Sequence, residues 1–125
     1  MTYSTREVAN ALGVPLKRLD NILGTAARSM VAKGAPGRSR MIPVQIVDQL
    51  ALAFLLERDL GMPTSRSVGI SSGLLQSSGG SLRVGVLGTL QYDVQRLRAV
   101  VRQALANALE GTGRPRRGRP RRLKN

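Results

Sequence analysis

The run from residue 44 to residue 60 constrains the fold of this chain most, because almost its whole surface is apolar. Pro43 precedes the run, and Gly61 and Pro63 follow it, so a helix bounded by these residues is expected. Six apolar residues form one stripe at helical spacing and three more widen it: Val44, Val47, Leu50, Ala51, Phe54 and Leu55, then Leu52, Ala53 and Leu56. Such a helix belongs at the centre of a core or in a subunit interface, and we expect the core.

Two short helices are expected near the N-terminus. Ser4 and Glu7 have the spacing of a capping box, in which each side chain bonds the backbone N–H of the other, so a helix begins there. Gly13 is expected to end it. A second helix follows over residues 15–23, with four apolar residues facing inward and four polar ones facing outward: Leu16, Leu19, Ile22 and Leu23, against Lys17, Arg18, Asp20 and Asn21. This pattern predicts a helix-turn-helix, with a generic αα-hairpin as the alternative.

A turn-rich segment separates this pair from the apolar helix. Glycine, proline and basic residues fill residues 33–40, and short apolar pieces flank them at Ser29–Val31 and Met41–Ile42. The pattern predicts a β-hairpin with a basic tip, which behind a helix-turn-helix is a wing; a solvated surface loop is the alternative. Beyond the apolar helix, one more short helix is expected over Thr64–Leu75, although two glycines within it disfavour helix.

The second half of the chain is expected to begin after a boundary. Glycine and serine dominate residues 76–81, which predicts a flexible linker. Leu82–Val86 and Thr89–Tyr92 are expected to form a weak β-hairpin, because glycines interrupt this region. A helix over Asp93–Glu110 follows, with Asp93 as its N-cap. Its aliphatic stripe either covers the core or forms the seam of a homodimer.

The C-terminal tail is basic throughout. Residues 113–122 contain no hydrophobic side chain, so we do not expect them to fold alone. The run Arg117-Gly118-Arg119-Pro120 resembles an AT-hook, and Gly113-Arg114-Pro115 repeats part of it. The resemblance implies that Arg117 and Arg119 lie in the narrow, strongly negative A·T minor groove. It implies phosphate contacts for the other basic residues of the tail: Arg114, Arg116, Arg121, Arg122 and Lys124. A generic tail for RNA or another polyanion is the alternative.

The charge of the chain points to a polyanionic partner. The formal net charge is +13, and residues 111–125 contain seven basic side chains and no acid. Residues 1–40 contain seven more basic side chains and two acids, so the positive charge lies mainly at the two ends. Nucleic acid is the commonest polyanion in a cell, with an anionic membrane surface as the competing partner.

The residue types that are missing exclude several kinds of chemistry. The chain has no cysteine and no histidine, so disulfides, the usual zinc and haem ligands, and Ser-His or Cys-His nucleophiles are excluded. We therefore expect a protein that is not an enzyme and uses no metal or cofactor. No segment has the roughly 18 apolar residues of a membrane span and no signal peptide is visible, so a cytoplasmic, nucleoid-associated protein is expected.

Residues 3–14 are similar to the opening of MerR-type winged helix-turn-helix proteins, a fold that excisionases of mobile elements share. The order of elements also matches, and residues 60–64 fall where that family places its second helix-turn-helix boundary. Two features depart from it: Pro15 replaces a polar cap, and residues 22–24 lack an aromatic cluster. Where the classical regulators continue into a long dimer coil and an effector domain, a Gly-Ser linker, a weak hairpin and one helix are expected here instead.

The resemblance implies how the N-terminal region meets DNA. Lys17, Arg18 and Asn21 would enter the major groove, where Asn and Arg make bidentate contacts with adenine and guanine. Arg38 and Arg40 would lie on the wing near phosphates or the minor groove, and Arg6 would bind phosphate beside the first helix.

Together these patterns predict a mainly α fold. We expect a winged helix-turn-helix domain with a small β-hairpin wing (1–75), a linker (76–81), a β-hairpin with a C-terminal helix (82–110) and a disordered AT-hook-like tail (111–125). The expected function is sequence-specific binding of double-stranded DNA by a transcriptional regulator, with no small-molecule ligand. The alternatives are an architectural nucleoid protein, an excisionase-like recombination factor and an RNA-binding protein. The scarcity of aromatic residues argues against the last.

Overall fold

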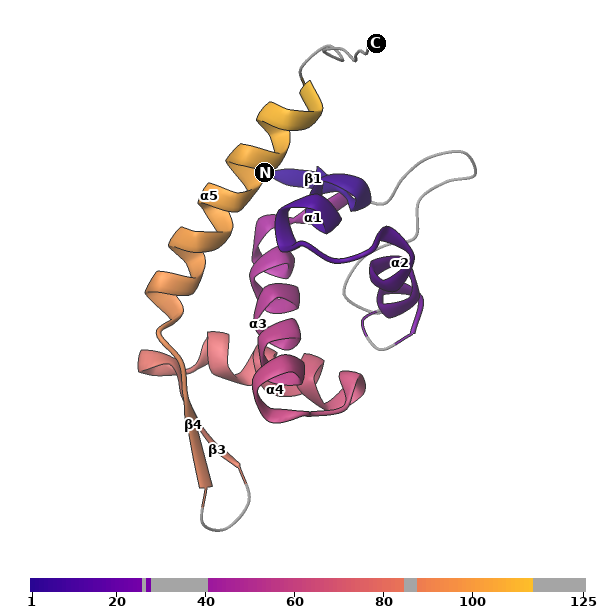
Figure 1. Cartoon of the computed structure of the whole chain (residues 1–125). Helices are drawn as coiled ribbons and strands as arrows, with labels where there is room; N and C mark the ends of the chain where they lie inside the picture. Colours follow the sequence, from indigo (N-terminus) through magenta and orange to yellow (C-terminus); the bar gives the residue numbers. More distant parts are fainter. Residues whose placement is uncertain (26, 28–40, 85–87, 114–125) are drawn as a thin grey trace.

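The computed structural model describes residues 1–25, 27, 41–84 and 88–113. Over these residues the fold is mainly helical, as expected, with two small antiparallel sheets. The helices are α1 (Thr5–Leu12), α2 (Leu16–Gly24), α3 (Val44–Leu60), α4 (Thr64–Gln76) and α5 (Val94–Gly113). The strands are β1 (Thr2–Ser4), β2 (Met41–Pro43), β3 (Ser81–Val84) and β4 (Gly88–Gln91), with a 3-10 turn η1 (Ser78–Gly80) before β3. Figure 1 shows α3 in the middle, α5 along one side, α2 on the other side, and α4 across the lower end of α3. Helix α1 lies over the upper end of α3, where it packs against α5.

Helix α3 is the centre of the hydrophobic core, which confirms the expectation from its apolar run. Six of its apolar residues are buried: Val47, Leu50, Ala51, Leu52, Ala53 and Leu56. The helix begins directly after Pro43 and ends at Gly61, whose φ of 65° is a left-handed conformation that glycine adopts without strain. Asp48 is also buried, at 2% exposure, and the sequence pattern did not predict this.

The first two helices form as their local signals predict. The Ser4 hydroxyl accepts a hydrogen bond from the Glu7 N–H at 3.1 Å, and the Glu7 carboxylate accepts one from the Ser4 N–H at 2.8 Å. Gly13 ends α1 at a φ of 68°, and α2 begins after Pro15. The expectation that Leu16 faces inward is wrong, because its side chain is 36% exposed. Leu16 is the first residue of α2 and lies at the edge of the core, whereas Leu19, one turn later, is buried.

A two-stranded sheet joins the starts of α1 and α3. Tyr3 pairs with Ile42 in the antiparallel register of β1 and β2, and both side chains are buried. The strand at Met41–Ile42 was expected, but its partner in the structure is β1, which the sequence did not predict. The expected pairing with Ser29–Val31, and the wing as a whole, lie outside the described residues.

The segment between α4 and α5 takes a defined path. Residues 76–81, expected as a flexible linker, end α4, form η1 and begin β3. Strands β3 and β4 make the expected hairpin, with Leu82 opposite Leu90. The glycines within α4 do not prevent the helix. One of them, Gly73, lies so close to β3 that a Cβ there would be 3.0 Å from a Leu82 methyl carbon.

Helix α5 completes the core rather than standing apart from it. Asp93 caps its start, since its carboxylate accepts a hydrogen bond from the Arg96 N–H at 2.9 Å. Val101 and Leu105 are buried in the same cluster as Val8 of α1 and Val47 of α3. A smaller cluster around Leu52, Leu56 and Leu74 lies between α3, α4 and the β3–β4 hairpin. Within the described residues, no helix is both long and apolar enough to cross a membrane.

Candidate nucleic-acid interface

Helix α2 presents one polar face to solvent. Leu19, Ile22 and Leu23 are buried, and this fixes the rotation of the helix. Lys17 and Asn21 are exposed and lie one turn apart, so they share a face. Among the described residues, neither side chain takes part in an ion pair or hydrogen bond. A cation and an amide therefore stand together on this face without a partner in the described part of the chain.

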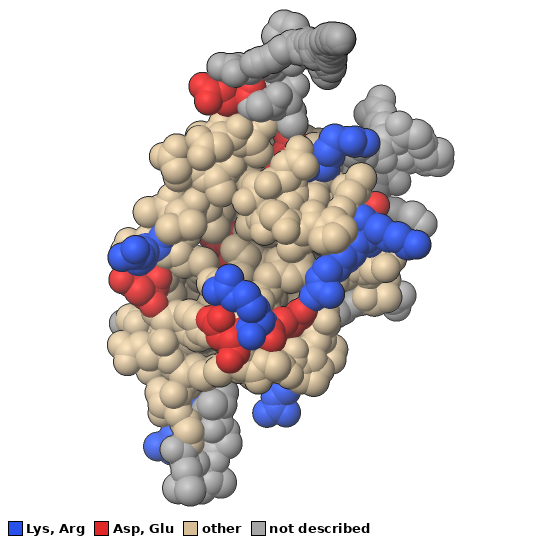
Figure 2. All heavy atoms as spheres, in the orientation of Figure 1, with Lys and Arg blue, Asp and Glu red and all other residues tan. Residues whose placement is uncertain are grey.

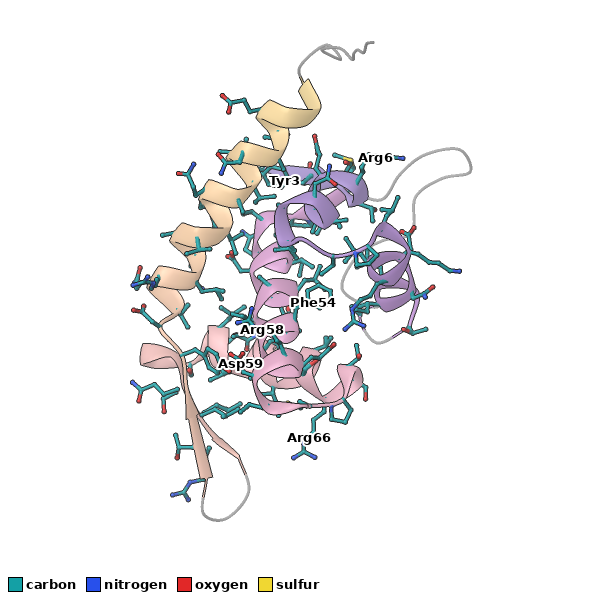
Figure 3. The ribbon with its side chains drawn as sticks, in the orientation of Figure 1. Tyr3, Arg6, Phe54, Arg58, Asp59 and Arg66 are labelled. Carbon is teal, nitrogen blue, oxygen red and sulfur yellow. The ribbon has the colours of Figure 1, made fainter. Side chains whose placement is uncertain are left out.

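Arg18, unlike the adjacent Lys17, turns toward α3. Its guanidinium pairs with the Glu57 carboxylate of α3 and lies over the Phe54 ring, 5.3 Å from the ring centroid. Figure 3 labels Phe54, whose ring lies between α3 and α2. Arg18 thus fastens α2 to α3, and a DNA contact by Arg18 would require this ion pair to open.

Arg6 lies in the first turn of α1 and is exposed. Its predecessors Ser4 and Thr5 hold the start of the helix, the first through the capping box and the second through burial. In Figure 3 Arg6 points outward on the side of α1 toward α2. In Figure 2 basic side chains follow the edge that α1 and α2 form, while most of the face is uncharged.

Sequence reasoning assigned no role to Arg66, which the structure places in an exposed position in the first turn of α4. Figure 3 shows it extending away from the body of the molecule, at the opposite end of α3 from Arg6. The signal in the sequence was an arginine among apolar and small residues of the expected helix over Thr64–Leu75, since a charged side chain is rarely buried without a partner.

Two arginines of α5 take part in ion pairs inside the fold and are not free on its surface. Arg98 and Arg102 both pair with the buried carboxylate of Asp48 on α3. The hydrogen bond to Asp48 is the main cause that raises the pKa of Arg102; burial opposes it, and the charges of Asp48 and Tyr3 add to it. Arg58 pairs with the adjacent Asp59. Within the described ranges, the basic residues without an ion pair are Arg6, Lys17, Arg66, Arg83 and Arg96.

The remaining predicted contact residues lie outside the described residues. They are Arg38 and Arg40 of the wing, and Arg114, Arg116, Arg117, Gly118, Arg119, Pro120, Arg121 and Arg122 of the tail. The structure therefore brings together Lys17 and Asn21 on α2, with Arg6 on the adjoining helix. In the described part of the chain, no group of three or more acidic residues gathers that could hold a metal ion.

Comparison with known proteins adds no assignment to this arrangement. No family model, curated protein or solved structure matches the chain.

Proposed function

We propose that this protein binds double-stranded DNA, with α1 and α2 acting as a helix-turn-helix and α2 entering the major groove. The observation that carries the proposal is the exposed pair Lys17 and Asn21 on a short surface helix whose apolar residues are all turned inward except Leu16. Asparagine forms bidentate hydrogen bonds with adenine, and lysine donates to guanine. Both side chains are free to make such contacts in the described structure.

Contacts to the DNA backbone would hold α2 in register. Arg6 lies at the start of α1, where the positive end of the helix dipole adds to its charge. Arg66 in the first turn of α4 is a second candidate for a phosphate contact. Arg18 has a positioning role in this proposal, because its pair with Glu57 fixes the angle of α2 on α3.

The tail would supply the second contact. Its arginines and glycines suit the A·T minor groove, and a tether raises the effective concentration of that contact near the site. The doubled Gly-Arg-Pro unit also favours a second candidate function, an architectural protein that coats A·T-rich DNA with little sequence preference. A regulator or an excisionase-like factor would instead hold one defined site, and a homodimer on paired half-sites remains a prediction for either.

The first experiment selects a preferred duplex from a random pool and measures binding by fluorescence anisotropy. Asn21→Ala is expected to weaken binding to that duplex by about 1–3 kcal/mol, the value of one bidentate base contact, and to leave binding to random duplex nearly unchanged. Lys17→Ala is compared with Arg96→Ala, because each removes one exposed, unpaired charge and Arg96 lies on α5. Equal losses for this pair would show that net charge, and not α2, drives binding.

The contribution of the tail is measured by salt dependence. Removal of residues 114–125 is expected to weaken binding and to lower the log–log salt slope by about 0.9 for each phosphate that the tail neutralises in the natural chain. An unchanged slope would exclude the tail as a DNA arm. If no duplex is preferred over random sequence but A·T-rich DNA is, the architectural function replaces the sequence-specific one.

A further inference from the structure

The ion pair between Arg18 and Glu57 joins the proposed DNA-reading helix to the centre of the fold. Among the described residues of α1 and α2, Arg18 is the only basic one with an ion pair. Its side chain is 45% exposed and that of Glu57 16% exposed. Both residues lie beside a mainly apolar hollow of about 570 Å³ that α1, α2, α3 and α5 form together. Apolar surroundings screen charge less than water does, so the attraction within this pair is stronger than on an open surface.

Arg18 is the only partner of the Glu57 carboxylate in the described part of the chain. One carboxylate oxygen pairs with the Arg18 guanidinium, and the other, Oε2, is buried with no hydrogen-bond donor among the described residues. If Arg18 left, a largely buried carboxylate would lose its partner, which costs more free energy than an exposed ion pair returns. The Phe54 ring, whose centroid is 5.3 Å from the guanidinium, adds a second attraction to α3. Arg18 is therefore held on α3 more firmly than one phosphate could hold it.

This pair also sets the number of free cations on α2. The helix has two basic residues, Lys17 and Arg18, and within the described residues Lys17 has no ion pair. A free cation attracts the phosphates of any duplex, because the DNA backbone carries no sequence information. Pairing with Glu57 neutralises Arg18, so α2 offers DNA one free cation instead of two.

We infer that Glu57 is a positioning residue that acts through Arg18 and determines how strongly the protein prefers its own site over other DNA. The inference rests on the proposed DNA binding by α2. Glu57 keeps Arg18 on α3 when DNA is bound and thereby lowers the affinity for duplexes that lack the preferred sequence. The same pair fixes the angle at which α2 presents Lys17 and Asn21, so affinity for the preferred sequence is retained.

The test measures how the full chain and its variants bind the preferred duplex and random duplex, by fluorescence anisotropy over a range of salt. Glu57→Gln keeps the size of the side chain and removes its charge, which frees Arg18. It is expected to tighten binding to random duplex by up to about eightfold at about 0.1 M salt and to raise the log–log salt slope by about 0.9, the effect of one added phosphate contact. The preferred duplex is expected to gain less, because α2 loses the contact that sets its angle.

Three further variants separate this effect from net charge and from damage to the fold. Asp59→Asn adds the same charge but frees Arg58 of α3, and is expected to raise the slope by less than half as much. Glu57→Gln combined with Arg18→Gln restores the natural net charge of +13 and is expected to cancel the gain. Glu57→Met, also uncharged and of similar size, is expected to repeat the gain. Circular dichroism checks that each variant keeps its helices.

Equal gains for Glu57→Gln and Asp59→Asn would overturn the inference, because net charge alone would explain them. A gain that survives the added Arg18→Gln would also overturn it. So would a loss from Arg18→Gln alone as large as that from Lys17→Gln, because Arg18 would then contact DNA in the natural chain.

Lys17→Gln distinguishes the failure of this inference from that of the proposed function. If Lys17→Gln weakens binding to random duplex and Glu57→Gln does not strengthen it, only the role of Glu57 is wrong. If Lys17→Gln changes nothing, α2 does not face DNA, and the proposed function and this inference are both wrong.

Discussion

The guanidinium of Arg102 on α5 donates two hydrogen bonds to the carboxylate of Asp48 on α3, Nη1 to Oδ1 at 2.7 Å and Nη2 to Oδ2 at 3.2 Å. The Asp48 side chain is 3% exposed and the Arg102 side chain 44% exposed, so the acid is inside and the base at the edge. Arg98, one turn earlier, places its Nε 3.7 Å from Oδ2. Because the buried carboxylate of Asp48 is paired only when Arg98 and Arg102 are opposite it, the pairing fixes the position of α5 along α3.

Removing Arg102 is expected to destabilise the protein. Arg102→Met keeps the aliphatic stem and deletes the donors, so the free energy of unfolding should fall by about 1–3 kcal/mol. This loss in the free energy of unfolding is smaller than the loss expected if Asp48 had no partner at all, because Arg98 remains near Asp48. Urea denaturation measures it, and Arg96→Met, at an exposed unpaired position on the same helix, is expected to stay within about 0.5 kcal/mol.

A double-mutant cycle isolates the pair itself. Asp48→Asn combined with Arg102→Met should cost less than the two single losses added together, with a coupling of about 0.5–3 kcal/mol. Strict additivity would mean that the bidentate contact contributes no coupling energy.

Gly80 is expected to resist substitution. Its φ is +69°, and a Cβ at this residue would lie 2.4 Å from the Tyr92 carbonyl oxygen and 2.7 Å from a Val94 methyl carbon. Gly79 has a similar φ of +77° but open space around it. Gly79→Ala should therefore cost only the left-handed strain of about 1–2 kcal/mol, and Gly80→Ala about 1–3 kcal/mol more because of the overlap. Thermal unfolding of the two variants compares them, and equal melting temperatures would contradict the expectation.

The capping box at the start of α1 makes a separate contribution. Ser4→Ala removes the acceptor for the Glu7 N–H and should lower the free energy of unfolding by about 1 kcal/mol. Ser4→Thr retains a hydroxyl and is expected to recover most of that loss. If the alanine variant is as stable as the natural chain, another group caps the helix.

Tyr92 should make stability depend on alkaline pH. Burial is the main cause that raises the pKa of its phenol above the usual 10.0; Asp59 adds to the shift and Arg58 opposes it. The folded state therefore keeps the proton at pH values where the unfolded chain has released it. Stability is full below about pH 10 and falls as the pH rises through the folded pKa. Urea denaturation from pH 8 to 11 should show a smaller alkaline decline for Tyr92→Phe than for the natural chain.

The limits of the helices could be predicted from the sequence because they depend on near neighbours. Ser4 with Glu7 set the start of α1, Pro43 and Gly61 bound α3, and Asp93 begins α5. These signals act within one or two turns of the chain, so their effect is the same in most surroundings.

The relations between distant elements could not be predicted in this way. Tyr3 pairs with Ile42, and Asp48 with Arg102, across long stretches of chain, and nothing in either local sequence specifies the partner. The same holds for the hollow beside Glu57, which four elements form together.

The candidate DNA interface was predictable in part. Helical periodicity places Lys17 and Asn21 on the exposed face, and the structure agrees. Arg18 is adjacent in sequence, but a side chain of that length also reaches α3, and the pair with Glu57 decided its direction. The roles given to the wing and tail arginines stay predictions.

The contact of α1 with α5 has a consequence for the order in which the chain acquires its structure. Val8 packs in one cluster with Val101 and Leu105, although most of the chain, residues 9–100, lies between Val8 and Val101. A growing polypeptide exposes the part of the first helix that α5 covers until the last helix has been synthesised, and contacts between such distant segments slow folding. A nascent chain that stops before α5 would present that side to chaperones or to other chains. We therefore expect residues 1–75, which the sequence analysis assigned to one domain, to be less stable without α5 than in the full chain.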